Sequence, residues 1–222
     1  MLASFVIGTL ALAPSAIDKW EIKPPYQKDK TYKMNVTIDV ESQGEHVAVT
    51  LGASLGITQQ DDKGFKANLS WTDITVNGSP AGMTMDAVCT LDKRGKLLKA
   101  DSEMGEEFRR QMLPMFFIYP EKPIEAGDKW SDETTKNPDG TKYQIKQEFE
   151  AKGIEKAEGD DAMKVAVKFT ESGESAMQVT GFFWIAKDGR PLKLDLDVKN
   201  WPIPQQGAGA SGDVKIKGTL AK

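Results

Sequence analysis

The sequence predicts a mainly β protein with one strongly curved antiparallel sheet, a half-barrel or open barrel. The sheet is expected to consist of two similar halves, with one central helix packed on its concave face. Three observations support this. Most segments alternate apolar and polar residues, as residues 32–41 do, and alternation is typical of strands with one covered face. Residues 101–115 follow a helical period instead. The phrase Asp-Lys-Trp occurs at 18–20 and again at 128–130.

Short alternating segments separated by turn residues fill both halves. Glycines at positions 52 and 56 interrupt the second of these segments, and glycine inside a strand indicates a bulge or a bend. Residues 153–161 are polar and are predicted to form a loop. The predicted strands span residues 32–41, 46–58, 65–76, 83–91, 96–100, 143–151, 163–169, 175–186, 192–198 and 214–220.

The central segment begins and ends like a helix. Asp101 and Ser102 are good N-cap residues, and Pro114 disfavours helical geometry at the residue before it. An apolar run at 116–120 follows. The helix and this run therefore need a large apolar surface to lie on. The apolar face of the predicted helix consists of Met104, Phe108, Met112 and Met115.

The two halves show further similarity. Tyr32 and Tyr143 each follow the repeated phrase, and a charged turn with Gly95 or Gly189 comes later in each half. These matches favour a duplication; chance similarity among β-hairpins, whose turns are common, is the alternative. We expect a single β-rich domain over 17–222, with repeat halves at 17–102 and 127–200, a helix and loop at 103–126, and a C-terminal strand at 213–221.

Charge and the first residues restrict partners and location. A net charge of −4 and a pI near 5.2 argue against nucleic acid, because phosphate binding needs a concentrated basic surface. Residues 1–16 form an apolar run ending in small residues, which is typical of a secretory signal peptide; a buried strand or an uncleaved anchor is the alternative. We expect a periplasmic or secreted protein of the bacterial envelope, with no stable membrane span after cleavage.

Catalytic and metal signatures are absent from the sequence. His46 is the one histidine, which excludes His-clustered metal sites. A Ser-His-Asp or Cys-His device could rest only on His46, whose neighbours Glu41 and Glu45 favour a solvated surface instead. Cys89 shares a predicted face with methionines and leucine, so we interpret it as a small buried hydrophobe rather than a reactive thiol. A single cysteine also permits no internal disulfide. We therefore predict a protein that is not an enzyme and needs no cofactor or metal.

Adaptable apolar residues remain as the functional signal. The chain has nine methionines, and methionine suits surfaces that accept variable apolar ligands. We predict binding of a lipid or acyl chain between sheet and helix. The alternative is an envelope scaffold or protein-interaction module with a fully packed core and another envelope protein as its partner. The candidate ligand-binding residues are Trp71, Met83, Met85, Phe108, Met112, Met115, Phe116 and Phe183.

The predicted signal peptide, curved sheet, repeated halves and central helix together resemble the LolA/LolB/LppX-like superfamily of bacterial envelope proteins. The phrases at 126–130 and 187–193 are similar to those of uncharacterised exported bacterial families of this shape. The resemblance implies a half-barrel that carries or binds lipids or lipoproteins. It assigns no individual ligand-contact residue, because the shared motifs are short.

Overall fold

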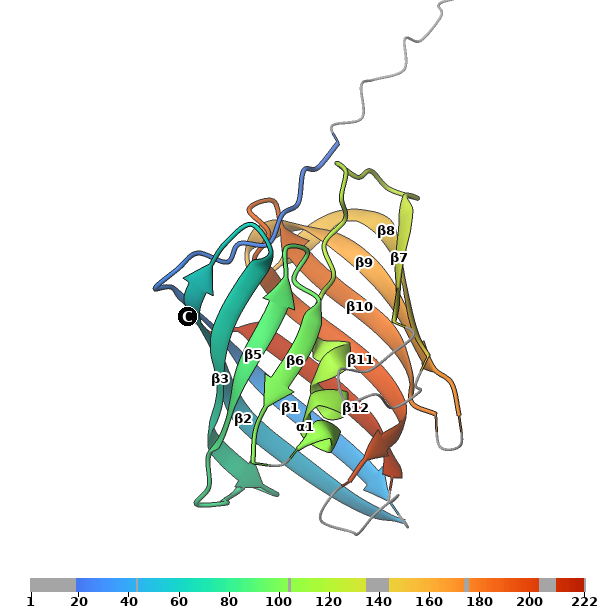
Figure 1. Cartoon of the computed structure of the whole chain (residues 1–222). Coiled ribbons are helices and arrows are strands. Elements are labelled where there is room, and N and C mark those ends of the chain that lie inside the picture. Colours follow the sequence, from blue (N-terminus) through green and yellow to red (C-terminus); the bar gives the residue numbers. More distant parts are fainter. Residues whose placement is uncertain are drawn as a thin grey trace, which may run out of the picture.

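The computed structural model describes residues 19–42, 44–103, 105–134, 144–173, 176–203 and 211–221. The predicted signal peptide at 1–16, together with Met104 and Tyr143, lies outside these ranges. Twelve described strands form one antiparallel sheet in the order β6-β5-β3-β2-β1-β12-β11-β10-β9-β8-β7, with β4 paired to β3 (Figure 1). The strands are β1 (Thr31–Ser42), β2 (Glu45–Gln60), β3 (Gly64–Val76), β4 (Ser79–Pro80), β5 (Met85–Asp92), β6 (Leu97–Asp101), β7 (Lys129–Thr134), β8 (Ile145–Ala157), β9 (Asp160–Glu171), β10 (Gln178–Ala186), β11 (Pro191–Pro202) and β12 (Ser211–Leu220).

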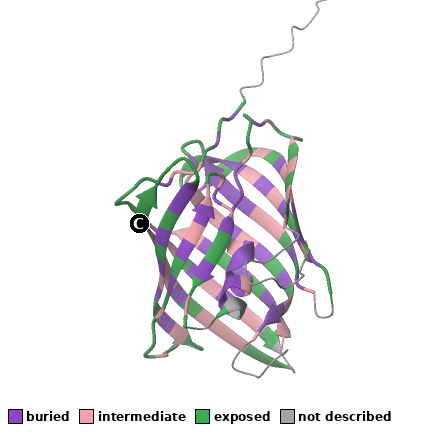
Figure 2. Cartoon of the chain, in the orientation of Figure 1, coloured by how far each residue is buried: buried purple, intermediate pink, exposed green. Residues whose placement is uncertain are grey.

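Two antiparallel meanders meet at the last strand. The first runs from β1 to β6 and the second from β7 to β11. Strand β12 pairs with β1 on one side and with β11 on the other, so the C-terminal strand joins the two meanders. Inward and outward residues alternate along the strands, which gives the striped burial pattern of Figure 2. The alternating sequence therefore specifies which face of each strand is covered.

The mainly β class, the antiparallel sheet and the helix are confirmed, but the predicted strong curvature is wrong. The sheet is neither closed nor strongly curled, and its end strands β6 and β7 do not pair with each other. The segment after the helix lies between them and takes hydrogen bonds from both sides. Nε1 of Trp130 in β7 donates to the carbonyl oxygen of Ile118 at 2.8 Å. Nε of Arg94, in the β5–β6 turn, donates to the carbonyl oxygen of Tyr119 at 2.9 Å.

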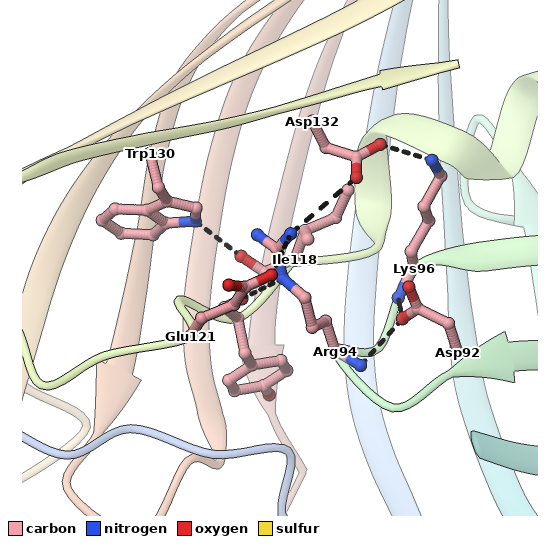
Figure 3. Close-up of polar contacts among 8 residues, drawn as sticks. Asp92, Arg94, Lys96, Ile118, Glu121, Trp130 and Asp132 are labelled. Atoms are coloured by element: carbon pink, nitrogen blue, oxygen red, sulfur yellow. Dashed lines mark hydrogen bonds and ion pairs between the residues drawn. The ribbon is translucent and has the colours of Figure 1, made fainter. Parts of the chain in front are cut away.

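Ion pairs also link the two ends of the sheet (Figure 3). Asp132 on β7 forms an ion pair with Lys96, and its other carboxylate oxygen lies 3.9 Å from Nη1 of Arg94. Arg94 also reaches Glu121 at 3.5 Å. The backbone N–H groups of Arg94 and Lys96 donate to Asp92, at 2.8 and 2.9 Å. This cluster orders the β5–β6 turn and fastens it to β7, so we assign it a structural role.

The helix differs from its predicted extent. α1 (Glu106–Met112) begins after Gly105, whose φ is 70°, and it continues into a 3₁₀ turn, η1 (Leu113–Met115). The predicted N-cap residue Asp101 belongs instead to β6, where it pairs with Val88 of β5. The pairing of β5 with β6 thus includes Asp101, the residue that the sequence predicted as a helix N-cap. Pro114 lies at the start of the 3₁₀ turn, as its missing N–H allows.

The helix and the segment after it pack against the sheet and complete the core. Phe108 is fully buried, and its ring meets that of Trp71 at 5.4 Å. Phe117 meets Phe149 at 5.5 Å and Phe183 at 5.3 Å, two residues of the second meander. One continuous hydrophobic cluster therefore includes residues of both meanders. This packing holds the helix in a fixed position beside the cavity described below.

The hairpins β5–β6 and β10–β11 are alike. Each has a register shift next to its turn, and each turn contains a glycine of positive φ, 81° at Gly95 and 88° at Gly189. The two Asp-Lys-Trp phrases, by contrast, lie in different surroundings. Trp20 forms an isolated bridge with Ile124 ahead of β1, whereas Trp130 belongs to β7. A duplication of the two halves stays a prediction.

Candidate functional site

An apolar cavity of about 330 Å³ lies between the first meander, α1 and the end of β11. Strands β1, β2 and β3 supply most of its wall, and the segment between β4 and β5 supplies part of its rim. The lining residues are Ile38, Val40, Glu45, Val47, Val49, Leu51, Trp71, Ile74, Val76, Met83, Met85, Gln111, Trp201, Pro202 and Ile203.

Period-two alternation positions the long wall of the cavity. Val47 and Val49 of β2 pair with Val40 and Ile38 of β1, so all four share the face that lines the cavity. The same face of β2 extends from Glu45 to Leu51, a distance of about 20 Å at roughly 3.3 Å per residue. This row of β2 residues forms one long wall of the cavity, which is called the slot below.

A β-bulge brings two large β3 residues to the same wall. Trp71 and Ile74 are an odd number of positions apart and would face opposite ways in a regular strand. The register between β2 and β3 shifts between Thr50 and Gly52, and Asp73 has a φ of 53°. This irregularity reverses the alternation, so Trp71 and Ile74 are both 6% exposed and both line the slot. Bulges commonly redirect side chains next to functional sites.

One end of the slot is open to solvent. Val76 is 39% exposed and Met83 is 47% exposed, although both are large apolar side chains. Leu51, Trp71 and Trp201 form the buried floor. A cavity with an apolar floor and an exposed apolar rim matches the usual construction of small-molecule sites, which are mostly apolar and concave.

Polar groups in the lining are few. Nε2 of Gln111 donates to the carbonyl oxygen of Pro202 at 2.8 Å, which ties α1 to the end of β11 in the lining of the cavity. Glu45 is exposed at the first residue of β2 and is the one ionisable residue among the described residues of the lining. The cavity can therefore accommodate an apolar body and offers one negative charge near its rim.

Three of the eight predicted ligand-binding residues line the slot, and the other five lie elsewhere in the structure. Trp71, Met83 and Met85 line the slot. Phe108 and Met112 are buried in the core, and Met115 is half-buried against it. Phe116 lines a smaller cavity of about 130 Å³. Phe183 packs in the core against Phe117. The slot lies beside the helix, whereas Phe108 and Met112 of the helix meet packed side chains.

Most of the slot was not identified from sequence. Alternation predicts the inward faces of β1 and β2, so it could have identified Ile38, Val40, Val47 and Val49. It could not have placed Trp201 in the slot, because the position of Trp201 depends on the pairing of β11 with β12 and of β12 with β1. Alternation alone does not specify the order of strands in a sheet.

The remaining reactive side chains have structural surroundings. Cys89 is fully buried, and burial raises the pKa of its thiol to about 12, so the thiolate is strongly disfavoured. His46 lies on the surface 3.7 Å from Asp39. Across the described ranges, no three His, Cys, Asp or Glu side chains gather in a way that could hold a metal ion. No described helix is long and apolar enough to cross a membrane.

Comparisons with known proteins show little beyond weak likeness. Residues 98–181, from β6 into β10, match the model of a family of unknown function, DUF6263, over less than half of the chain. No curated protein matches the sequence. A crystal structure from Bacteroides fragilis, described as a candidate exported protein with a YmcC-like fold, is similar at 12% identity and a TM-score of 0.38. That similarity covers 91% of this chain and 98% of the other.

Proposed function

We propose that this protein is a non-enzymatic binding protein that holds an apolar ligand, a lipid or acyl chain, in the slot beside α1. The observation that supports this is the slot itself: about 330 Å³, walled by aliphatic and aromatic side chains, and open at an apolar rim. Val76 and Met83 are exposed apolar side chains at the opening of the slot. Exposed apolar side chains around a cavity are typical of a binding site and are not needed to fill a packed core.

Elementary energetics favour such an occupant. Burial of apolar surface contributes about 25 cal/mol per Å², and a preformed slot loses little conformational entropy when a ligand enters. Methionines at the rim adapt to ligands of different shape. The volume lies near the lower end of the roughly 300–1,000 Å³ of small-molecule sites. We therefore expect a single chain or a small apolar molecule rather than a lipid with several chains.

Export and a LolA-like role in handling lipid belong to the same proposal. They are supported by the apolar run at residues 1–16 and by the sequence resemblance stated above. In this proposal the protein acts in the periplasm or outside the cell, where an open apolar slot protects an acyl chain from water.

Native mass spectrometry of protein purified from its own host tests the binding proposal. We expect a bound mass that organic extraction removes and identifies as a lipid or acyl compound. Val49→Trp fills the middle of the slot, while His46→Trp adds the same side chain to the exposed face of β2. We expect the bound mass to disappear in Val49→Trp and to persist in His46→Trp.

Failure of this test has a clear meaning. If wild-type protein carries no ligand and binds no added acyl compound, the slot is not a ligand site. The sequence-based alternative, an envelope scaffold or interaction module, then becomes the better account, and pull-down from envelope extracts is the experiment that follows.

A further inference from the structure

We infer that the slot selects amphiphiles with a cationic head group, such as an alkylammonium, over those with a carboxylate head. This inference rests on the proposed function and adds a ligand class to it. It depends on the position of one charge, Glu45, on a face that is otherwise apolar.

The register of β2 places Glu45 on the wall of the slot. Glu45, Val47, Val49 and Leu51 are spaced by two residues and therefore share one face, and all four line the cavity. Exposure falls along this row, from exposed Glu45 through half-buried Val47 and Val49 to buried Leu51. A ligand whose tail reaches Leu51 would thus leave its head group beside Glu45.

Glu45 is the one charge on the slot wall. No Lys or Arg occurs among the described residues of the lining. The neighbouring charges of this hairpin lie on the opposite face of the sheet, where Glu41 pairs with His46 and with Asp213, and Asp39 pairs with Lys215. A head group at the open end of the slot therefore meets the carboxylate of Glu45, which attracts a cation and repels an anion.

The lining holds one other polar side chain among its described residues. Gln111 is buried and donates from its amide nitrogen to the carbonyl oxygen of Pro202 at 2.8 Å. A ligand that entered with its charged head inward would exchange the hydration of that head for at most this one neutral amide. The tail-inward orientation therefore costs less and leaves the head near solvent and near Glu45.

Three probes with the same twelve-carbon tail test the inference: dodecylammonium and dodecanoate, each below its critical micelle concentration, and dodecan-1-ol below its solubility limit. Trp71 and Trp201 lie in the wall of the slot, so tryptophan fluorescence and calorimetry both report entry. We expect dodecylammonium to bind about tenfold more tightly than dodecanoate at low ionic strength, with the alcohol between them. Added salt should reduce this difference.

Two matched variants locate the effect. Glu45→Gln removes the charge on the slot wall, and Glu41→Gln removes an equal charge from the outer face of the neighbouring strand. We expect the preference for ammonium to fall to about twofold or less in Glu45→Gln and to persist in Glu41→Gln. Binding of dodecan-1-ol should be similar in both variants.

The results separate the two proposals. Equal affinity for all three heads, or a preference that survives Glu45→Gln, overturns the head-group inference and leaves apolar binding in place. Absence of binding by any of the three probes, with no change in tryptophan fluorescence, overturns both.

Discussion

Arg110 of α1 and Glu171 of β9 form a two-point ion pair that fixes the helix against the sheet. Nε of Arg110 lies 2.9 Å from Oε1 of Glu171, and Nη2 lies 2.6 Å from Oε2. The backbone N–H of Met177 also donates to Oε2, at 2.9 Å. The Glu171 side chain is 1% exposed. Because α1 also supplies Gln111 to the slot, this pair holds one wall of the candidate site in place.

Glu171→Ala should lower the free energy of unfolding by about 3 kcal/mol, because it removes a buried carboxylate that accepts from the Met177 N–H and forms a two-point ion pair with Arg110. Urea unfolding followed by circular dichroism measures the change. Asp197→Ala is the control: its ion pair with Lys215 is exposed, and the expected change is within about 0.5 kcal/mol. A loss below about 1 kcal/mol for Glu171→Ala would contradict a stabilising role for the buried pair.

The glycine of the β10–β11 turn supports a second prediction. Gly189 has a φ of 88°, and a Cβ atom there would lie 1.8 Å from the carbonyl oxygen of Lys23. Gly159 has a similar φ of 95° but open space around its Cβ position. Gly159→Ala should cost about 1 kcal/mol, the penalty of left-handed backbone alone. Gly189→Ala should cost clearly more, because the backbone of residues 23–25 must move. Equal losses in the two variants would show that the contact with Lys23 is not tight.

The strands were predicted well where buried and exposed residues alternate along the sequence. They were predicted less well where a polar segment forms a strand through backbone hydrogen bonds alone. Residues 153–161 were predicted as a loop because they are polar. They instead extend β8 to Ala157 and continue into β9, joined by a tight turn whose Glu158 and Gly159 have positive φ. Backbone pairing there does not need an apolar face. Strand β7 was missed for the same reason, since Lys129–Thr134 is mostly polar.

The candidate site was predicted in part. Trp71 and Met85 line the slot from strands that the sequence predicted. Met83 also lines it, but from the exposed segment ahead of β5 and not from the predicted strand. Phe108 and Phe183 were assigned to a ligand because they are large and inward-facing, and these same properties make them good core residues. Whether an inward aromatic side chain meets a ligand or another side chain depends on its three-dimensional neighbours, here Trp71 and Phe117.

Stability should fall at alkaline pH. Burial raises the pKa of Cys89 to about 12 and also raises the pKa values of Tyr26 and Tyr119. A raised folded-state pKa means that the unfolded chain loses its proton first, so stability is complete below the ordinary value and declines above it. For Cys89 that decline begins near its ordinary pKa of 9.0, and for the tyrosines near 10.0. Each group should remove about 1.4 kcal/mol per pH unit beyond that point.

Urea unfolding at a series of pH values between neutral and alkaline measures this decline. Cys89→Ala should abolish the first part of it, between the ordinary pKa values of cysteine and tyrosine, and leave the later part unchanged. The native thiol should also resist alkylation until the protein unfolds, since Cys89 is fully buried. Rapid alkylation of folded protein near neutral pH would contradict the buried, protonated thiol.

The link between the two ends of the sheet supports the last prediction. Asp132 forms an ion pair with Lys96, and their side chains are 16% and 17% exposed. Asp132→Asn keeps the shape of the side chain but leaves Lys96 without this carboxylate, and should cost about 2 kcal/mol. Because the contact joins β7 to the β5–β6 turn, amide hydrogen exchange should accelerate in β6 and β7 and remain slow in β1 and β12. Glu133→Gln, an equal charge change on an exposed β7 residue, should leave both measurements unchanged. Uniform acceleration throughout the sheet would indicate global destabilisation instead of a local link between its ends.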